Sequence, residues 1–259
     1  MPWDDTQEIT QMTINAIDCL GGEVTASGRK TLINGATKTG MFTRRRVDAV
    51  RAWRQKRDRA ATRELANTPS TFAEVRQPTS DYLALPTVSS IRRRYIPVAM
   101  LSSDVIASNQ VYVFPNATLY DFGIVSSEMH MAWVRSVGGR LKSDYRYSAG
   151  IVYNNFPWPI DATGKDKAAI AAAAQEVLRV RGQFSDSSLA DLYDPLSMPQ
   201  ALLKAHHKLD KAVDKAYISS GGKRSWPTEA QRVAFLFALH QKIASMLPPK
   251  KVSRKVGLI

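Results

Sequence analysis

The residue composition and hydrophobic pattern of the chain change near residue 160, and this change limits the folds that the chain can adopt. Between residues 82 and 125, short runs rich in Val, Ile and Tyr alternate with Pro, Ser, Asn and Asp, a pattern typical of short strands. After Pro159 the sequence turns to alanine-rich and amphipathic runs, which predict helices over 165–181, 187–193, 200–217 and 228–247. Strands that precede helices, instead of alternating with them, favour the α+β class.

We therefore expect a mixed α/β domain with a short β-sheet over residues 44–160, followed by a small helical bundle over residues 161–259. One helix of the first domain is expected over residues 126–137, between a serine cap and a Gly-Gly pair. Residues 1–43 show no clear periodicity and are set apart as a separate segment. The length of 259 residues allows one large domain or two modest ones.

Positive charge is concentrated in one stretch. The formal net charge is +13, and residues 29–63 hold twelve Lys and Arg against two acidic residues. Because residues 44–66 lack Gly and Pro, we expect one helix there that ends before Pro69. Its arginines have few acidic partners, so nucleic-acid phosphates are the expected counter-charge. The arginines assigned to phosphate are Arg44, Arg45, Arg51, Arg54 and Arg57.

Two other interpretations of this charge stay open. A highly charged helix is often simply a solvated face, and an acidic protein partner could also neutralise it. The tail that begins at Pro248 is basic as well. Charge by itself therefore indicates a polyanionic partner without identifying it.

Residues 140–147 alternate strictly between two kinds of side chain. As a single strand, this segment places four charged residues on one face, with a turn over 148–150 and a return strand over 151–155. Lysine matches the acceptors of guanine and aspartate accepts from cytosine N4, so Lys142 and Asp144 could read one G·C pair. An exposed strand whose charges neutralise each other is the alternative. The four charged residues are Arg140, Lys142, Asp144 and Arg146.

Several long motifs resemble one family. The runs PTVSSIRRRYIPVAML, DVIAS and ATLYDFGIVSSEMHMAWVRSVGGRLKSDYRYSAGIVYNNFPWP resemble the target-recognition domain of MmeI-like DNA methyltransferases, the single-chain type IIL/IIG restriction-modification enzymes. The runs SSLADLYDPLSMP, LLKAHHKLDKAVDKAY and RVAFLFALHQK resemble the C-terminal helical domain of the same family. The resemblance extends from about Arg44 to Leu247 and does not include residues 1–43.

The resemblance implies roles for particular residues. In that family the positions of Lys142 and Asp144 set the recognition of one base pair, which agrees with the chemistry of the two side chains. Arg140, Arg146 and Ser148 lie beside them as further base or phosphate contacts. Three consecutive arginines fall in a matching basic motif and are expected to bind backbone phosphates. These are Arg92, Arg93 and Arg94.

The resemblance also implies chemistry that this sequence does not support. Members are class I enzymes that transfer a methyl group from S-adenosylmethionine to adenine, which needs a Gly-rich loop and an Asn-Pro-Pro-Tyr-type motif. Neither occurs here, and no acidic nuclease motif is evident. We therefore expect no catalytic residue, no metal, no cofactor bound by this chain and no methyl transfer by it alone.

The expected partner is double-stranded DNA, and a separate catalytic chain is a second candidate partner, as for a truncated enzyme or a specificity subunit. A lone cysteine, Cys19, and the lack of a long apolar run predict a cytoplasmic protein without a membrane partner. His206 and His207 are adjacent and do not match the spacing of a zinc pair. The alternative function is a protein-interaction module of a defence system that has lost DNA reading.

Overall fold

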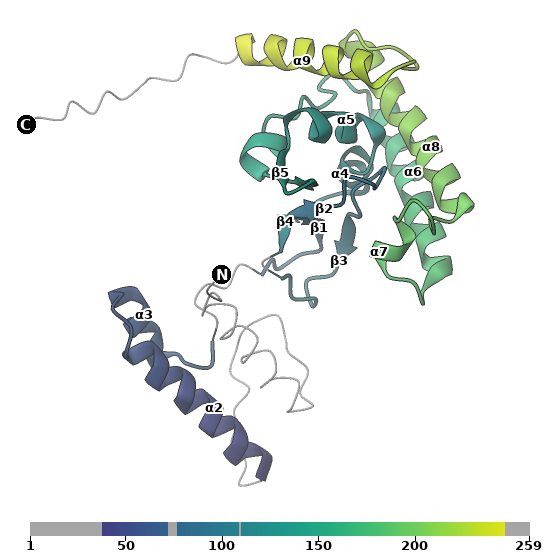
Figure 1. Ribbon diagram of the computed structural model, residues 1–259. Helices are drawn as coiled ribbons and strands as arrows, with labels where there is room; N and C mark the ends of the chain where they lie inside the picture. The colour runs from purple at the N-terminus through teal and green to yellow at the C-terminus, as the bar shows by residue number, and fades with distance from the viewer. Residues whose placement is uncertain (1–37, 72–76, 109, 247–259) are drawn as a thin grey trace, which may run out of the picture. The chain divides into compact units, whose positions relative to one another are not determined.

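The computed structural model describes residues 38–71, 77–108 and 110–246, with side chains from residue 44 onward (Figure 1). The expected segment 1–43 and the basic tail lie almost entirely outside these residues. The chain divides into two compact units, which are described separately. Unit 1 holds the described residues up to Thr79 together with Ser103–Ile106, and unit 2 holds Ser80–Ser102 and the chain from Ala107 onward.

The basic stretch of unit 1 forms two helices instead of one. Helix α2 spans Lys38–Gln55, α3 spans Ala60–Glu64, and a 3-10 turn continues over Leu65–Asn67. The single helix predicted over residues 44–66 is therefore wrong, although the segment has neither Gly nor Pro to interrupt it.

Arg54 supplies the physical reason for the break. Its guanidinium donates to the carbonyl oxygens of Leu65 at 2.8 Å, Thr68 at 2.9 Å and Thr71 at 3.1 Å, so the following chain folds back on α2. The residue is only 7% exposed. The assignment of Arg54 to a DNA phosphate is therefore wrong, because the side chain is buried and its donors already bind three carbonyl groups of the protein.

Replacing Arg54 with Met is expected to destabilise unit 1 locally. The change removes three charge-assisted hydrogen bonds and should cost about 3 kcal/mol. Hydrogen exchange of the amides in residues 60–71 should accelerate accordingly. As a control, Arg51→Met on the exposed side of the same helix removes only a surface ion pair with Asp48 and should leave the exchange almost unchanged. Equal exchange in both variants would contradict this role of Arg54.

Unit 2 contains two small antiparallel sheets. Strands β1 (Tyr82–Pro86), β3 (Ala99–Leu101) and β4 (Val111–Pro115) pair in the order β3-β1-β4. The second sheet pairs three very short strands in the order β2-β6-β5. Its strands are β2 (Val88–Ser89), β5 (Gly139–Leu141) and β6 (Asp144–Arg146).

The helices of unit 2 begin at residues suited to capping them. Thr118 and Thr163 each form a capping box with the aspartate three residues later, and Ser127 accepts a bond from the backbone of His130. The helices predicted over 126–137, 165–181, 200–217 and 228–247 are confirmed to within about two residues. The helices are α4 (Leu119–Val125), α5 (Glu128–Val137), α6 (Gly164–Arg181), α7 (Leu189–Leu192), α8 (Gln200–Ala216) and α9 (Glu229–Met246).

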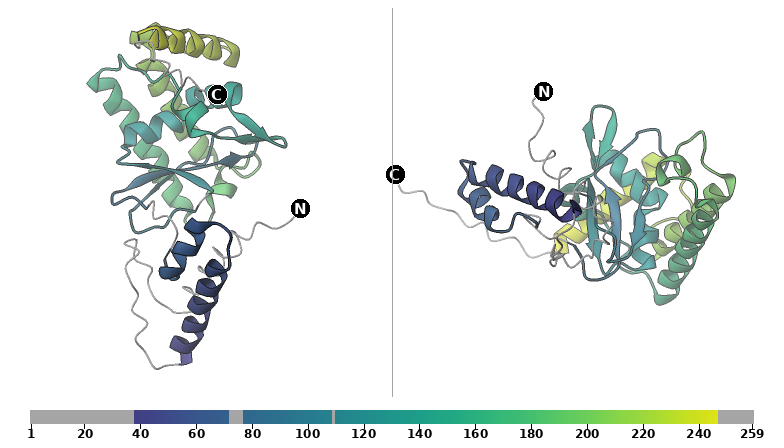
Figure 2. Two further views of the ribbon diagram at one scale, coloured as in Figure 1. Left: turned by 90° about the vertical axis from the view of Figure 1, so that its left-hand side faces the viewer. Right: turned by 90° about the horizontal axis from the view of Figure 1, so that it is seen from below.

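One hydrophobic core serves the strands and the helices of unit 2. Buried Leu83 of β1, Ile170 of α6 and Leu209 of α8 belong to the same cluster, and α6 and α8 lie side by side (Figures 1 and 2). Close approach at Gly123 contributes, since a Cβ atom there would lie 2.6 Å from Cγ2 of Ile170. The expected α+β class is confirmed, but residue 160 does not separate two cores, because α4 packs directly on α6.

No helix among the described residues is both long and apolar enough to cross a membrane.

Candidate nucleic-acid interface

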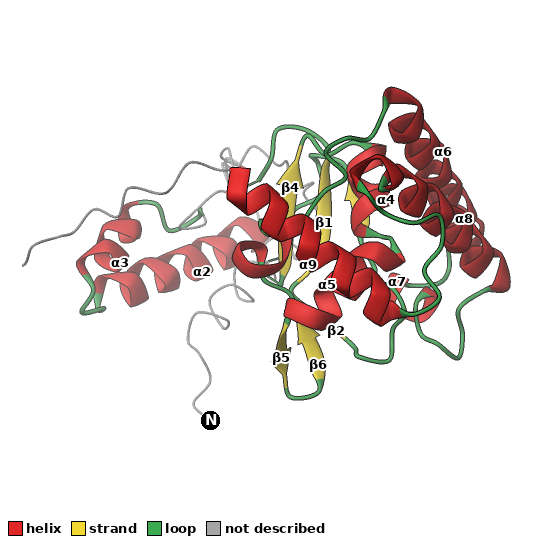
Figure 3. Cartoon of the chain, turned by 90° about the horizontal axis from the view of Figure 1, so that it is seen from above, coloured by secondary structure: helices red, strands yellow, loops and turns green. Residues whose placement is uncertain are grey.

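Strands β5 and β6 form a hairpin that projects from the helices of unit 2 (Figure 3). Leu141 pairs with Asp144, and the two residues between them form the turn. The single strand predicted over residues 140–147 is therefore wrong, since the chain reverses direction at its middle. The return strand predicted over 151–155 is wrong as well, because Ala149–Tyr153 form a π-helical turn.

The register of the hairpin separates the four charged residues. Residues directly opposite each other in an antiparallel pair share a face, and neighbours along a strand alternate. Leu141, Asp144 and Arg146 thus share one face, while Arg140 lies opposite Tyr145 on the other. The prediction that all four charges lie on one face is wrong for Arg140.

Arg140 makes contacts inside the protein. Its guanidinium lies 4.3 Å from the centre of the Tyr145 ring and donates to the carbonyl oxygens of Arg135 at 3.2 Å and Gly138 at 3.2 Å. These carbonyls belong to the end of α5, where the last carbonyl groups lack helical partners. The exposed Arg140 therefore caps the C-terminus of α5. A contact from its guanidinium to a DNA base would compete with these hydrogen bonds.

Lys142 occupies the first position of the turn. Its φ of 55° lies in the left-handed region, and only Asn116 shares a positive φ among the described residues other than glycine. A two-residue hairpin connection requires such a backbone and normally takes glycine or asparagine. Lysine there costs about 1 kcal/mol. The exposed ammonium makes no hydrogen bond or ion pair with the described residues, and the same holds for the exposed guanidinium of Arg146.

Asp144 links the hairpin to a second basic segment. Its Oδ1 accepts the backbone N–H of Ile91 at 3.2 Å. Because β2 pairs with β6, residues 90–94, here called the arginine loop, lie beside the hairpin. The sequence indicates each segment as basic but carries no signal that joins them across more than fifty residues. Ile91 and this pairing were therefore missed at the sequence level.

The arginines of this loop differ in how strongly their guanidinium groups are bonded to other residues of the protein. Arg92 is exposed and lies 3.9 Å from a carboxylate oxygen of Asp194, and Arg93 donates to the carbonyl of Ala190 at 3.4 Å. Both are long contacts, and neither fully occupies its guanidinium. Arg92 and Arg93 can therefore still donate to an external anion.

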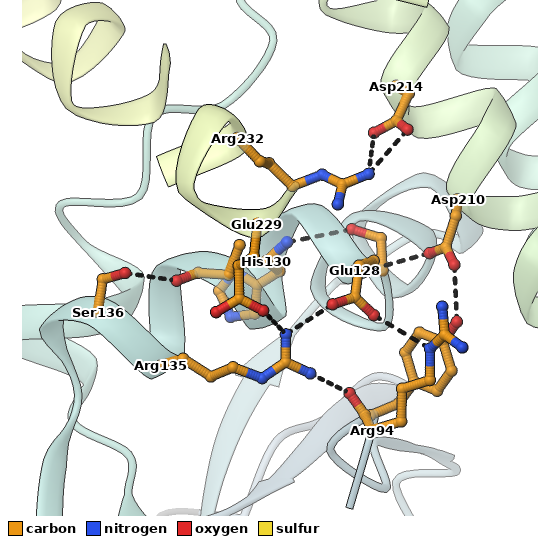
Figure 4. Close-up of polar contacts among 12 residues, drawn as sticks. Arg94, Glu128, His130, Arg135, Ser136, Asp210, Asp214, Glu229 and Arg232 are labelled. Atoms are coloured by element: carbon orange, nitrogen blue, oxygen red, sulfur yellow. Dashed lines mark hydrogen bonds and ion pairs between the residues drawn. The ribbon is translucent and has the colours of Figure 1, made fainter. Parts of the chain in front are cut away.

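Arg94, in contrast, belongs to an ion-pair network (Figure 4). Glu128 accepts from Arg94 at 3.3 Å and from Arg135 at 2.6 Å, and Arg135 also reaches Glu229 at 2.6 Å. Although burial lowers the pKa of the Arg94 guanidinium, the neighbouring Tyr95 and Glu128 raise it on balance. Arg94 therefore joins the loop to α5, and its charge is largely compensated within unit 2.

The base of the hairpin is anchored in the core. The buried Tyr147 hydroxyl lies 2.9 Å from Nε2 of His130 on α5. Ser148 Oγ accepts the backbone N–H of Ile151 at 3.3 Å and caps the π-helical turn. Because the Ser148 hydroxyl is the acceptor in this bond, its O–H can still donate to a base. The anchoring fixes the position of the exposed tip relative to the rest of unit 2.

Helix α2 of unit 1 carries exposed arginines of its own. Arg44 and Arg45 are exposed, and Arg51 is exposed and paired with Asp48 at 2.5 Å. Arg57 is half-buried, with its guanidinium 3.6 Å from the centre of the Trp53 ring. Arg44, Arg45 and Arg51 are the residues of this helix best placed to meet phosphate.

Among the described residues no group of three or more His, Cys, Asp or Glu side chains could hold a metal ion. His206 is buried, stacks on Tyr95 with ring centres 4.2 Å apart and shares a hydrogen bond of 2.7 Å with the Tyr193 hydroxyl. This histidine is a core residue.

Comparison with known proteins relates both parts of this chain to one family. Residues 33–160 match the family model "MmeI, target recognition domain", and residues 162–248 match "MmeI, C-terminal domain". DNA methyltransferase A of Bacillus subtilis (strain 168) is 38% identical over 206 residues, which are 80% of this chain and 23% of that protein. The type IIL restriction-modification enzyme MmeI, solved in complex with DNA, is 44% identical with a TM-score of 0.72, covering 83% of this chain and 28% of the other. The chain spans about a quarter of the length of these relatives.

Proposed function

Because this chain belongs to the MmeI family, whose target recognition and C-terminal domains it matches, we propose that it binds double-stranded DNA and recognises a base sequence in it. The observation that carries the proposal is the anchored hairpin, which presents Lys142, Asp144 and Arg146 beside the arginine loop. The similar solved enzyme is described in complex with DNA, which supports the same role.

We assign each residue a DNA contact according to whether its side chain is already bonded within the protein. Lys142 and Asp144 address the edges of one base pair, where lysine donates to guanine and aspartate accepts from cytosine. Arg146, on the face of Asp144, addresses the neighbouring base or its phosphate. The backbone is held by Arg92 and Arg93 in unit 2 and by Arg44, Arg45 and Arg51 in unit 1.

In this proposal the chain is the specificity module of a class I S-adenosylmethionine-dependent DNA adenine methyltransferase of a restriction-modification system. S-adenosylmethionine supplies the methyl group in that chemistry. The residues present do not fit it, because the sequence has neither the Gly-rich loop nor the Asn-Pro-Pro-Tyr-type motif. We therefore assign no step of methyl transfer to this chain and expect none from it alone.

The proposal is tested by selecting bound duplexes from a randomised pool. The chain should enrich a defined consensus at moderate salt, and an acidic polypeptide competitor should leave the enrichment intact. Binding without a consensus, or no binding at all, would contradict sequence recognition. Such a result, together with displacement by the acidic competitor, would favour the protein-interaction module instead.

Neutralising the arginine loop should weaken DNA binding without altering specificity. Each arginine that binds a phosphate releases counterions, so the plot of the logarithm of the binding constant against the logarithm of salt concentration has a negative slope. The double variant Arg92→Gln with Arg93→Gln should make this slope less negative by about 2. The consensus selected from the pool should not change. Arg179→Gln, which removes a charge from an exposed ion pair on α6, serves as the control and should leave the slope unchanged. A slope unaffected by the double substitution would contradict the phosphate role.

A further inference from the structure

Two large apolar side chains are exposed on either side of Asp144. Leu141 is 49% exposed and lies directly opposite Asp144 in the hairpin, on the same face. Ile91 is 47% exposed, and its backbone N–H is bonded to the Asp144 carboxylate. Single exposed apolar residues are common on proteins. Here, however, two of them border the carboxylate to which base reading is assigned.

The spacing of the hairpin determines what Leu141 can reach. Opposed residues have Cβ atoms roughly 5 Å apart, and successive base pairs are stacked about 3.4 Å apart. If Asp144 addresses the edge of one base pair, Leu141 therefore meets the adjoining pair. Leucine has no hydrogen-bonding group, so it can discriminate only through an apolar contact. The apolar group that the major groove offers is the C5-methyl of a pyrimidine, as in thymine.

We propose that Leu141 selects a C5-methyl pyrimidine in the base pair next to the one addressed by Lys142 and Asp144. This inference rests on the proposed function and names one further position of the recognised sequence. Thymine and 5-methylcytosine present the same methyl group at the same place. The contact therefore acts equally on both, and on neither uracil nor unmodified cytosine.

The test measures binding to the selected consensus duplex with single changes at the adjoining pyrimidine. Four duplexes carry thymine, deoxyuridine, cytosine or 5-methylcytosine there, and each methylated base is compared with its own demethylated form so that base pairing is unchanged. Removing the methyl group should weaken binding about fourfold, the ratio expected for one buried methyl group. Leu141→Ala should reduce both ratios to about one.

Two further variants make the test specific. Leu196→Ala removes a leucine that is 87% exposed outside the hairpin and should keep both ratios. Leu141→Met keeps an apolar chain of similar size and should retain most of the discrimination. Because Leu141 is exposed, the Leu141→Ala variant should unfold at the same temperature as the unmodified protein. Each ratio compares two duplexes bound by the same protein sample, so it does not depend on the fraction of that sample that is active.

Three results would overturn the inference. They are a consensus with no A·T pair at either adjoining position, equal binding of the methylated and demethylated duplexes, and discrimination that survives Leu141→Ala. Each of these can occur while a consensus is still recovered, so the inference can fail while the proposed function stands. If no consensus is recovered, the proposed function itself fails, and the inference fails with it.

Discussion

Replacing Asp210 with Asn is expected to make the free energy of unfolding fall by about 2 kcal/mol between pH 6 and pH 4 relative to the unmodified protein. Asp210 accepts the Tyr95 hydroxyl at 2.7 Å and the backbone N–H of Glu128 at 2.8 Å. Burial raises its pKa to about 6, in spite of these two bonds. In the unfolded chain the pKa of aspartate is about 3.9.

The sign follows from which state binds the proton first. As the pH falls from 6 to about 4, the folded protein takes up a proton at Asp210 before the unfolded chain does, so the folded state gains stability. This gain is lost again as the pH rises through 6. Burial raises the pKa of Asp214 to about 6 as well, against the opposing charge of Arg232, so this residue acts in the same direction.

Two buried histidines act in the opposite direction. Burial lowers the pKa of both His130 and His206 to about 3, whereas histidine in an unfolded chain has a pKa of about 6.5. Their contribution to stability is complete above pH 6.5 and is lost progressively as the pH falls to 3. The contributions of these two aspartates and two histidines therefore nearly offset each other between pH 6 and pH 4. Below pH 4 the aspartates no longer oppose the loss of stability that the histidines cause.

Urea unfolding at a series of pH values tests this balance. The unmodified protein should change little between pH 6 and pH 4, whereas Asp210→Asn, which keeps an acceptor for the Glu128 N–H, should lose stability steadily there. Asp186→Asn, at an exposed carboxylate, is the matched control and should parallel the unmodified protein. Parallel curves for Asp210→Asn and the unmodified protein would show that Asp210 does not take up the proton.

Exchanging the charges at Lys142 and Asp144 is expected to change the preferred base at one position of the recognised sequence. A correct bidentate contact to a base is worth about 1–3 kcal/mol, so the preference at that position should shift by about tenfold to a hundredfold. Because the net charge is unchanged, binding to bulk DNA should persist. The turn tolerates the exchange, since aspartate adopts a positive φ more readily than lysine.

An ion pair on α6 provides the matched control for this exchange. Glu176 and Arg179 are joined at 2.7 Å on the surface, and exchanging them also preserves the net charge. That variant should select the same consensus as the unmodified protein. The hairpin exchange removes the bond from Ile91 to Asp144, so thermal unfolding should be measured alongside. An unchanged consensus after the hairpin exchange would show that these two residues do not read the base pair.

Much of the helical structure follows from local sequence. Thr163 with Asp166, Ser127 and Pro199 mark the starts of α6, α5 and α8, because capping side chains and proline act on the backbone within a few residues of themselves. The apolar periodicity of these segments then determines which face is buried. Such signals are readable without knowledge of the rest of the chain.

The errors have a common origin in contacts between distant residues. Helix α2 ends where it does because Arg54 binds carbonyl groups eleven to seventeen residues later. The alternation of residues 140–147 fits one strand as well as two strands joined by a two-residue turn, and Lys142-Ser143 lacks the Asn-Gly signal of a hairpin. Neither outcome is encoded within a short window of sequence.

The sequence by itself determined the α+β class, the order of the long helices, the family resemblance and the residues with the chemistry to read and hold DNA. Tertiary structure alone decided which of those residues are available. In the folded protein Arg54 is buried, Arg140 binds carbonyl groups at the end of α5, and Arg94 pairs with Glu128. The pairing of β2 with β6 places the arginine loop beside the hairpin. The physical reason is that propensities and caps act over a few residues, whereas the availability of a charged side chain depends on partners from distant parts of the chain.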